Sequence, residues 1–153
     1  MNHIKVLLTL ILISYVPSSV LYASDNFGAI QVIVNAKAET SVMTKKHVMA
    51  LFLGRSRAFP NGKPVKPLDN KIGSPIREQF FEMLTGKSIS DIDAYWARIR
   101  YSGRASPPKE IDNIDEILTE VSQNVGVMAY VSGQNPEELS KQGIVVVYTL
   151  EAN

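Results

Sequence analysis

A short segment in the middle of the chain combines residue types that together bind small anions. Gly73 and Ser74 stand before Pro75, and a proline at this place is typical of the first position of an α-helix. Free amides at a helix N-terminus, the positive end of the helix dipole and a serine hydroxyl favour phosphate or carboxylate oxygens. Arg77, further into the same turn, would add a charge-assisted hydrogen bond. Because Gly-Ser-Pro is also an ordinary helix start, a plain cap and an anion site are both open.

Other residues with catalytic or metal-binding chemistry lack the spacing that these functions need. His47 is the only histidine outside the first 23 residues, so no second histidine stands at ligand spacing. Asp91 and Asp93 alternate as metal ligands do, but no glycine and distal glutamate complete a calcium loop, and acids are typical of a first helical turn. We therefore predict no enzyme activity, no cofactor and no metal. An enzyme would need a pairing made by the fold, such as His47 with Asp69 or Glu78.

The composition excludes several classes of protein. The 153 residues carry 16 Lys and Arg against 15 Asp and Glu, a formal net charge of +1. Nucleic-acid binding needs a basic excess that neutralises phosphates, so we expect no nucleic-acid partner. The chain has no cysteine, which excludes disulfides and zinc–thiolate sites. The length favours one domain, large enough to bury a hydrophobic core without such cross-links.

The N-terminal residues have the pattern of a secretory signal peptide. Lys5 precedes an apolar run over residues 6–16. We predict cleavage after Ala23, which divides the chain into a signal peptide over 1–23 and one periplasmic domain over 24–153. The alternative is a membrane anchor. A membrane span needs about 20 apolar residues, but this run is interrupted at Pro17, Ser18 and Ser19. We therefore expect no stable membrane insertion after cleavage.

The hydrophobic pattern of the predicted mature chain alternates between strands and amphipathic helices. Apolar, β-branched runs predict strands near residues 29–35, 65–68, 126–131 and 144–150, and helical spacing predicts helices that begin near Thr44, Ser74, Ser90, Ile114 and Asn135. The strand at 65–68 contains Pro67 and follows Pro64, so we expect it to lie at a sheet edge or to be short. A loop is expected over 102–108. The predicted fold is an α/β domain with a small mixed sheet flanked by helices.

The order of several short motifs resembles that of a known family. The motifs are Ile33-Val-Asn35, Leu51-Phe-Leu-Gly54, Phe59-Pro-Asn-Gly62, Pro67-Leu-Asp69, Gly73-Ser-Pro-Ile-Arg77, Tyr95-Trp96, Ser102-Gly103 and Gly126-Val-Met-Ala-Tyr-Val131. Each is unspecific alone, but their order resembles short substrate-binding proteins related to the periplasmic phosphate-binding component of ABC transporters. The resemblance implies one lobe of a type II periplasmic binding protein.

The same resemblance implies a ligand held by a Gly-Ser-Gly-Thr type turn at a helix N-terminus and by an arginine shortly before it. Gly73 and Ser74 match the start of that turn. Pro75 and Ile76 replace the second glycine and the threonine, which removes an amide donor and a hydroxyl, and Asp69 lies near the place of the arginine. The candidate anion-binding residues are Gly73, Ser74 and Arg77, with Ser102 and Gly103 as an opposing loop.

Two functions compete on this basis. The leading hypothesis is an exported solute-binding protein for phosphate or a related oxyanion, associated with ABC-type uptake through a membrane transporter. The alternative is a periplasmic interaction or sensory adaptor that has kept the lobe but not tight ligand binding, with a transporter or a sensor protein as its partner. The alternative predicts an apolar surface patch, for which Phe59 and Tyr101 are candidates.

Overall fold

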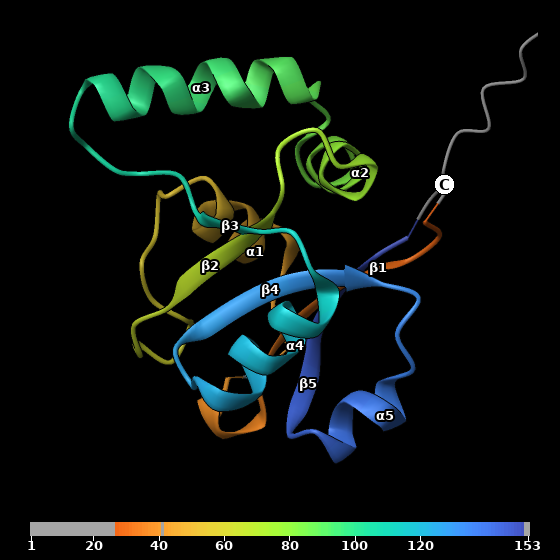
Figure 1. The fold of residues 1–153 in the computed structure, drawn as a ribbon. Helices are drawn as coiled ribbons and strands as arrows, with labels where there is room; N and C mark the ends of the chain where they lie inside the picture. Colours follow the sequence, from red (N-terminus) through yellow and green to blue (C-terminus); the bar gives the residue numbers. More distant parts are fainter. Residues whose placement is uncertain (1–26, 41, 152–153) are drawn as a thin grey trace, which may run out of the picture.

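The computed structural model describes residues 27–40 and 42–151 (Figure 1). The predicted signal peptide and its cleavage site lie outside the described residues. No helix in the described part of the chain is long and apolar enough to span a membrane.

A five-stranded mixed sheet forms the centre of the fold, with the strand order β3-β2-β4-β1-β5. The strands are β1 (Ile30–Asn35), β2 (Lys66–Asn70), β3 (Lys109–Ile111), β4 (Val127–Ser132) and β5 (Ile144–Leu150). β2 is parallel to both β3 and β4, whereas β1 is antiparallel to β4 and β5. The predicted α/β class with a mixed sheet is confirmed.

Helices cover both faces of this sheet. They are α1 (Lys45–Phe52), α2 (Pro75–Thr85), α3 (Ile89–Tyr101), α4 (Ile114–Gln123) and α5 (Pro136–Lys141), with a short 3-10 turn at Ala36–Ala38. Figure 1 shows α1, α2 and α3 on one side of the sheet and α4 and α5 on the other. The strands alternate accordingly: Val32 and Val34 pack toward α1–α3, and Ile33 packs toward α4 and α5.

Most helix boundaries follow from local signals. Thr44 caps α1, since its hydroxyl accepts a hydrogen bond from the amide of His47 at 3.3 Å, and Asn135 caps α5 by accepting from the amide of Glu137 at 2.8 Å. The predicted start of α3 at Ser90 is wrong by one residue. Ser88 is the cap, because its hydroxyl accepts from the amide of Asp91 at 3.2 Å.

β2 is an interior strand of the sheet, and its pairing with its two neighbours is divided at a proline. β2 lies between β3 and β4, so it is not an edge strand. Its pairing is nevertheless divided at Pro67: Lys66 and Pro67 pair with β4, whereas the segment from Leu68 to Asn70 pairs with β3. Proline has no amide donor, and β3 begins opposite the residue that follows it. Lys66 and Pro67 therefore have no described strand beside them on the β3 side.

Candidate functional site

Arg77 points into the protein from the first turn of α2. Its side chain is 3% exposed, and its Nε donates to Asp69 Oδ2 at 2.9 Å while Nη2 donates to Asp93 Oδ1 at 2.9 Å. The guanidinium also lies 5.3 Å from the centroid of the Phe81 ring. Arg77 is thus not the available cation that the sequence analysis expected, because two carboxylates already bind its charge.

The helical spacing explains why Arg77 is buried. Arg77 stands three, four and seven residues before the buried side chains of Phe80, Phe81 and Leu84, so it belongs to the same stripe of α2. A buried guanidinium needs carboxylate partners, because an unpaired charge in the interior is costly. The sequence contained this spacing, but it did not indicate which carboxylates would meet the arginine.

Asp69 completes the arrangement from β2. It is 3% exposed, and the Tyr130 hydroxyl donates to its Oδ1 at 2.5 Å. Burial raises the pKa of Asp69 above its ordinary value, although the hydrogen bond from Tyr130 and the charge of Arg77 act in the opposite direction. Burial and the neighbouring Asp69 charge also raise the pKa of the Tyr130 hydroxyl. We call Asp69, Arg77, Asp93 and Tyr130 the buried ionic cluster, although the side chain of Asp93 at its edge is 46% exposed. In the cluster, one guanidinium faces two carboxylates.

α2 begins at Pro75 as predicted, but the side chain of Ser74 at its N-cap makes no cap hydrogen bond. Gly73 is exposed and has φ of +82°, the left-handed conformation that favours glycine. The amide of Ser74 donates to the carbonyl of Lys71 at 3.0 Å. The Ser74 hydroxyl makes no cap hydrogen bond, and its oxygen is buried with no partner among the described residues. Ser74 therefore stands at the N-cap position, as expected, but the expected hydrogen bond from its hydroxyl group is not made.

Acidic side chains of the β3 segment contact the same turn. The amide of Ile72 donates to Glu110 Oε2 at 3.0 Å, and Lys71 Nζ lies 2.7 Å from Asp112 Oδ2. A carboxylate of the chain itself thus occupies one amide of the turn, and a second carboxylate pairs with its lysine. The surroundings of the candidate anion site are acidic.

The structure does not bring the proposed opposing loop to this turn. Ser102 and Gly103 follow the C-terminal end of α3, which Figure 1 shows far from α2. Asp93 near the start of α3 reaches Arg77, whereas Ser102 follows nine residues later, roughly 14 Å along the helix axis. The Ser102 hydroxyl donates to the carbonyl of Ile99 at 2.8 Å.

The pairing of His47 with Asp69 or Glu78, given above as an example of an enzyme site, is not made in the described residues. His47 is exposed on α1, and it hydrogen-bonds to neither Asp69 nor Glu78 in the described part of the chain. Within residues 27–40 and 42–151, no group of three His, Asp or Glu side chains is placed to hold a metal ion.

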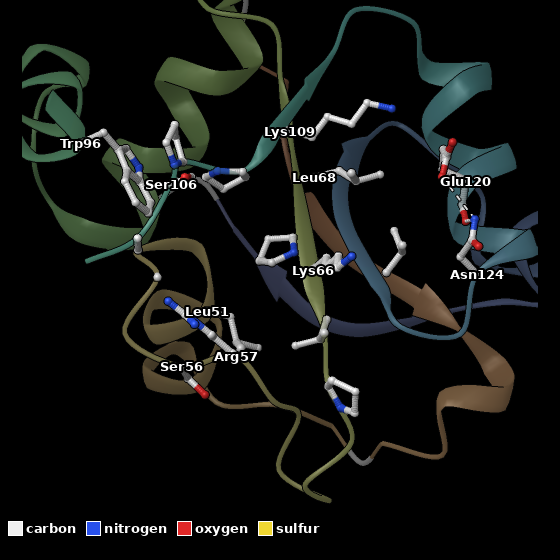
Figure 2. A pocket seen from close by; sticks show the side chains of 18 residues that line it. Leu51, Ser56, Arg57, Lys66, Leu68, Trp96, Ser106, Lys109, Glu120 and Asn124 are labelled. Carbon is white, nitrogen blue, oxygen red and sulfur yellow. Dashed lines mark hydrogen bonds between the residues drawn. The ribbon is translucent and has the colours of Figure 1, made fainter. Parts of the chain in front are cut away.

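A cleft of about 690 Å³ lies at the N-terminal end of β2, opposite the end that leads to α2 (Figure 2). Figure 2 shows Trp96 at one end of this cleft, Glu120 at the other and Leu68 of β2 between them. The volume is within the range of about 300 to 1,000 Å³ that ligand sites have. The cleft was not predictable from the sequence, because its lining comes from segments far apart in the chain. Further apolar lining residues are Leu51, Pro64, Val65, Pro67, Pro107, Pro108 and Val127.

Trp96 is both a core residue, as expected from its helical spacing, and a wall of this cleft. It is 5% exposed and packs against Gly54 so closely that a Cβ at Gly54 would lie 2.8 Å from the indole Cη2. Gly54 has φ of +66°, so glycine is favoured there on two grounds. The two residues join α3 to the end of α1.

Of the two residues expected to mark an apolar surface patch, only Tyr101 is exposed. Phe59 is 3% exposed and belongs to the core, so it cannot form a surface patch. Tyr101 is 96% exposed at the end of α3.

No family model and no curated protein sequence matches this chain. Solved structures do match it. An ABC-type phosphate transport receptor from Vibrio cholerae matches with a TM-score of 0.57 and 10% identity, over 79% of this chain and 46% of that one. A putative phosphate ABC transporter substrate-binding protein from Clostridium perfringens, solved with bound phosphate, matches with 0.57 and 14%, over 79% and 45%. PstS from Borrelia burgdorferi matches with 0.60 and 9%, over 78% and 46%.

The fold matches that of one PstS-type lobe. The chain spans less than half the length of these solved structures, and identity at this level establishes the fold alone. Within this PstS-like lobe, the two features that bear on function lie at opposite ends of β2: the buried ionic cluster at Asp69, and the cleft beside Lys66.

Proposed function

We propose that this chain is an exported, non-enzymatic PstS-like lobe that acts by contacting a partner protein and does not capture phosphate tightly. The observation that carries the proposal is the pairing of Arg77 with Asp69 and Asp93 at 2.9 Å each. The only cation of α2 is thereby withdrawn from the surface. Export rests on the predicted signal peptide, and cell fractionation tests it.

The electrostatics of the turn before α2 support this proposal. A phosphate placed there would approach the carboxylate of Glu110, which already accepts from the amide of Ile72. To use Arg77, it would have to displace carboxylates from a side chain that is 4% exposed. Pro75 has no amide to donate.

The second candidate is the capture of phosphate or a related oxyanion, associated with ABC-type uptake. One observation favours it: the Ser74 hydroxyl oxygen is buried and has no partner in the described residues. One of the similar solved structures contains bound phosphate. In this candidate, the partner of the chain would be a membrane transporter.

Calorimetry with inorganic phosphate separates the two candidates. The full chain is expressed for export, purified, and titrated with millimolar phosphate at low and at high salt, with a thermal-shift measurement in parallel. We expect neither heat nor a shift in melting temperature. Saturable heat that Ser74→Ala weakens, and that the exposed control Ser140→Ala on α5 leaves unchanged, would establish anion capture and overturn the proposal.

A further inference from the structure

The positive charges of the chain are concentrated in two segments. Residues 40–68 contain six Lys and Arg, residues 94–109 contain four, and neither segment contains an Asp or Glu. These two segments therefore hold ten of the 16 positive charges, whereas the rest of the chain holds six positive charges and all 15 acids. The cations are Lys45, Lys46, Arg55, Arg57, Lys63, Lys66, Arg98, Arg100, Arg104 and Lys109.

The fold brings these two segments together at the cleft. Arg57 Nη2 donates to the carbonyl of Arg104 at 3.1 Å, and the Tyr95 hydroxyl donates to the carbonyl of Leu53 at 2.7 Å. Among the described residues, Lys63 is the only one of the ten cations with an ion-pair partner. Three of the ten cations, Arg57, Lys66 and Lys109, line the cleft, and none of these three has an ion-pair partner in the described residues.

The exposed lysines at this rim come from adjacent strands. Lys66 of β2 and Lys109 of β3 both line the cleft and are exposed, as is Arg57 (Figure 2). The one acid of the lining, Glu120, lies at the far end, where Asn124 Nδ2 donates to its Oε2 at 3.2 Å. Oppositely charged groups of a partner would be attracted to the rim and oriented by it.

The shape of the cleft favours an extended occupant. A second hollow of about 370 Å³ shares Pro64, Val65 and Lys66 with the cleft and continues to Val125, which is 38% exposed. On the β3 side, Lys66 and Pro67 have no described strand beside them. An extended chain can lie along such a strand and place alternate side chains in pockets.

We propose that this cleft binds an extended, acidic segment of a partner protein. Its apolar side chains enter the cleft between Trp96 and Val127, and its carboxylates meet Arg57, Lys66 and Lys109. The inference rests on the proposed function, for which it supplies the docking surface and the chemistry of the partner. A small inorganic anion would not use the apolar lining, and a flat anionic membrane would contact the rim without filling the interior.

Selection from a random peptide library displayed on phage tests the chemistry of the occupant. The full chain serves as bait, and each enriched peptide is synthesised and titrated against it. Trp96 is the only tryptophan of the chain, so its fluorescence reports directly on the cleft. We expect the enriched peptides to be acidic with apolar residues, and to shift the Trp96 emission saturably at low salt and weakly at high salt.

A matched pair of charge-reversal variants locates the binding surface. Lys66→Glu/Lys109→Glu changes the rim, and Lys37→Glu/Lys87→Glu changes two exposed lysines outside it by the same net charge. We expect the first variant to weaken peptide binding by about tenfold or more and the second to change it by less than about twofold. Far-UV circular dichroism and the urea midpoint verify that both variants are folded.

The remaining outcomes overturn the inference in distinguishable ways. Enrichment of peptides without acidic residues would show that the occupant is not acidic, and equal binding to both variants would show that the cleft is not the docking surface. A Trp96 shift with phosphatidylglycerol vesicles and none with any enriched peptide would assign the rim to a membrane. Self-association that only Lys66→Glu/Lys109→Glu abolishes in sedimentation velocity would make a second copy the occupant. Phosphate binding in the calorimetric test would refute the proposed function and leave the peptide result to stand by itself.

Discussion

The two ends of β2 use charge in opposite ways. At the C-terminal end, Asp69 is 3% exposed and shares a hydrogen-bonded cluster with Arg77, Asp93 and Tyr130. At the N-terminal end, Lys66 is exposed at the rim of an apolar cleft and has no ion-pair partner among the described residues. A buried charge must be paired because its desolvation is costly, whereas an exposed one keeps its hydration and can still attract a partner.

This contrast separates the part of the fold that holds its layers together from the part available for binding. The buried ionic cluster connects β2, α2, α3 and β4 through side chains. Substitution of one residue of the buried ionic cluster should therefore lower the free energy of unfolding. Substitutions at the cleft rim should change the affinity for a partner and have little effect on stability.

The largest expected effect is that of Arg77→Met. Methionine preserves much of the side-chain volume but leaves Asp69 buried without its cation. We expect the free energy of unfolding to fall by about 3 to 5 kcal/mol, as it does when one partner of a buried ion pair is removed. Urea denaturation followed by circular dichroism measures this change.

The exposed arginine Arg100 on α3 supplies the control for that measurement. Arg100→Met should change the free energy of unfolding by less than about 0.5 kcal/mol. If the free energy of unfolding falls equally in both variants, or by less than about 1 kcal/mol in Arg77→Met, then the buried ionic cluster does not hold the layers of the fold together.

A smaller effect is expected in the pH dependence that Asp69 contributes. Because burial raises its pKa, the folded state holds a proton on this carboxyl more tightly than the unfolded state does. The resulting contribution to stability is complete below the unfolded pKa of about 3.9 and is lost as the pH rises through the folded pKa. The advantage of the parent protein over Asp69→Asn should therefore decrease as the pH is raised from about 4. Urea denaturation of both proteins across this range measures the difference.

Tyr130→Phe sharpens this test. The Tyr130 hydroxyl donates to Asp69 and so opposes the effect of burial on the pKa of the carboxyl. Without that hydroxyl, the pKa of Asp69 in the folded state should rise further. The decrease in the stability advantage over Asp69→Asn should then extend to higher pH. An advantage over Asp69→Asn that grows with pH would mean that the charge of Arg77 outweighs burial at this site.

The elements of the fold that local chemistry specifies were predictable from the sequence. Pro75 begins α2, and Gly86 ends it with φ of +70°, as the fixed φ of proline and the freedom of glycine predict. β3 was missed, because Lys109–Ile111 is too short to show an alternating pattern. Local rules also do not state which strand lies beside which, so the interior position of β2 required the structure.

The candidate sites were less predictable, since both depend on residues far apart in the chain. Arg77 and Asp69 are eight residues apart, but Tyr130 lies 61 residues from Asp69. The missing acids in residues 40–68 and 94–109 were visible in the sequence. Their meaning depends on the contact between the two segments, such as the hydrogen bond from Arg57 to the carbonyl of Arg104.

The smallest expected effect on stability is that of Lys66→Gln/Lys109→Gln at the cleft rim. Both lysines are exposed and neither has an ion-pair partner in the described residues, so their removal should change the free energy of unfolding by less than about 0.5 kcal/mol. We expect a small gain in the free energy of unfolding at low salt, because the substitution relieves repulsion within a group of like charges. This gain should vanish at high salt, since the Debye length falls from about 30 Å at 0.01 M to about 3 Å at 1 M. Urea denaturation at both salt concentrations measures the change, and a clear loss of stability would show that the rim charges hold the fold together as the buried cluster does.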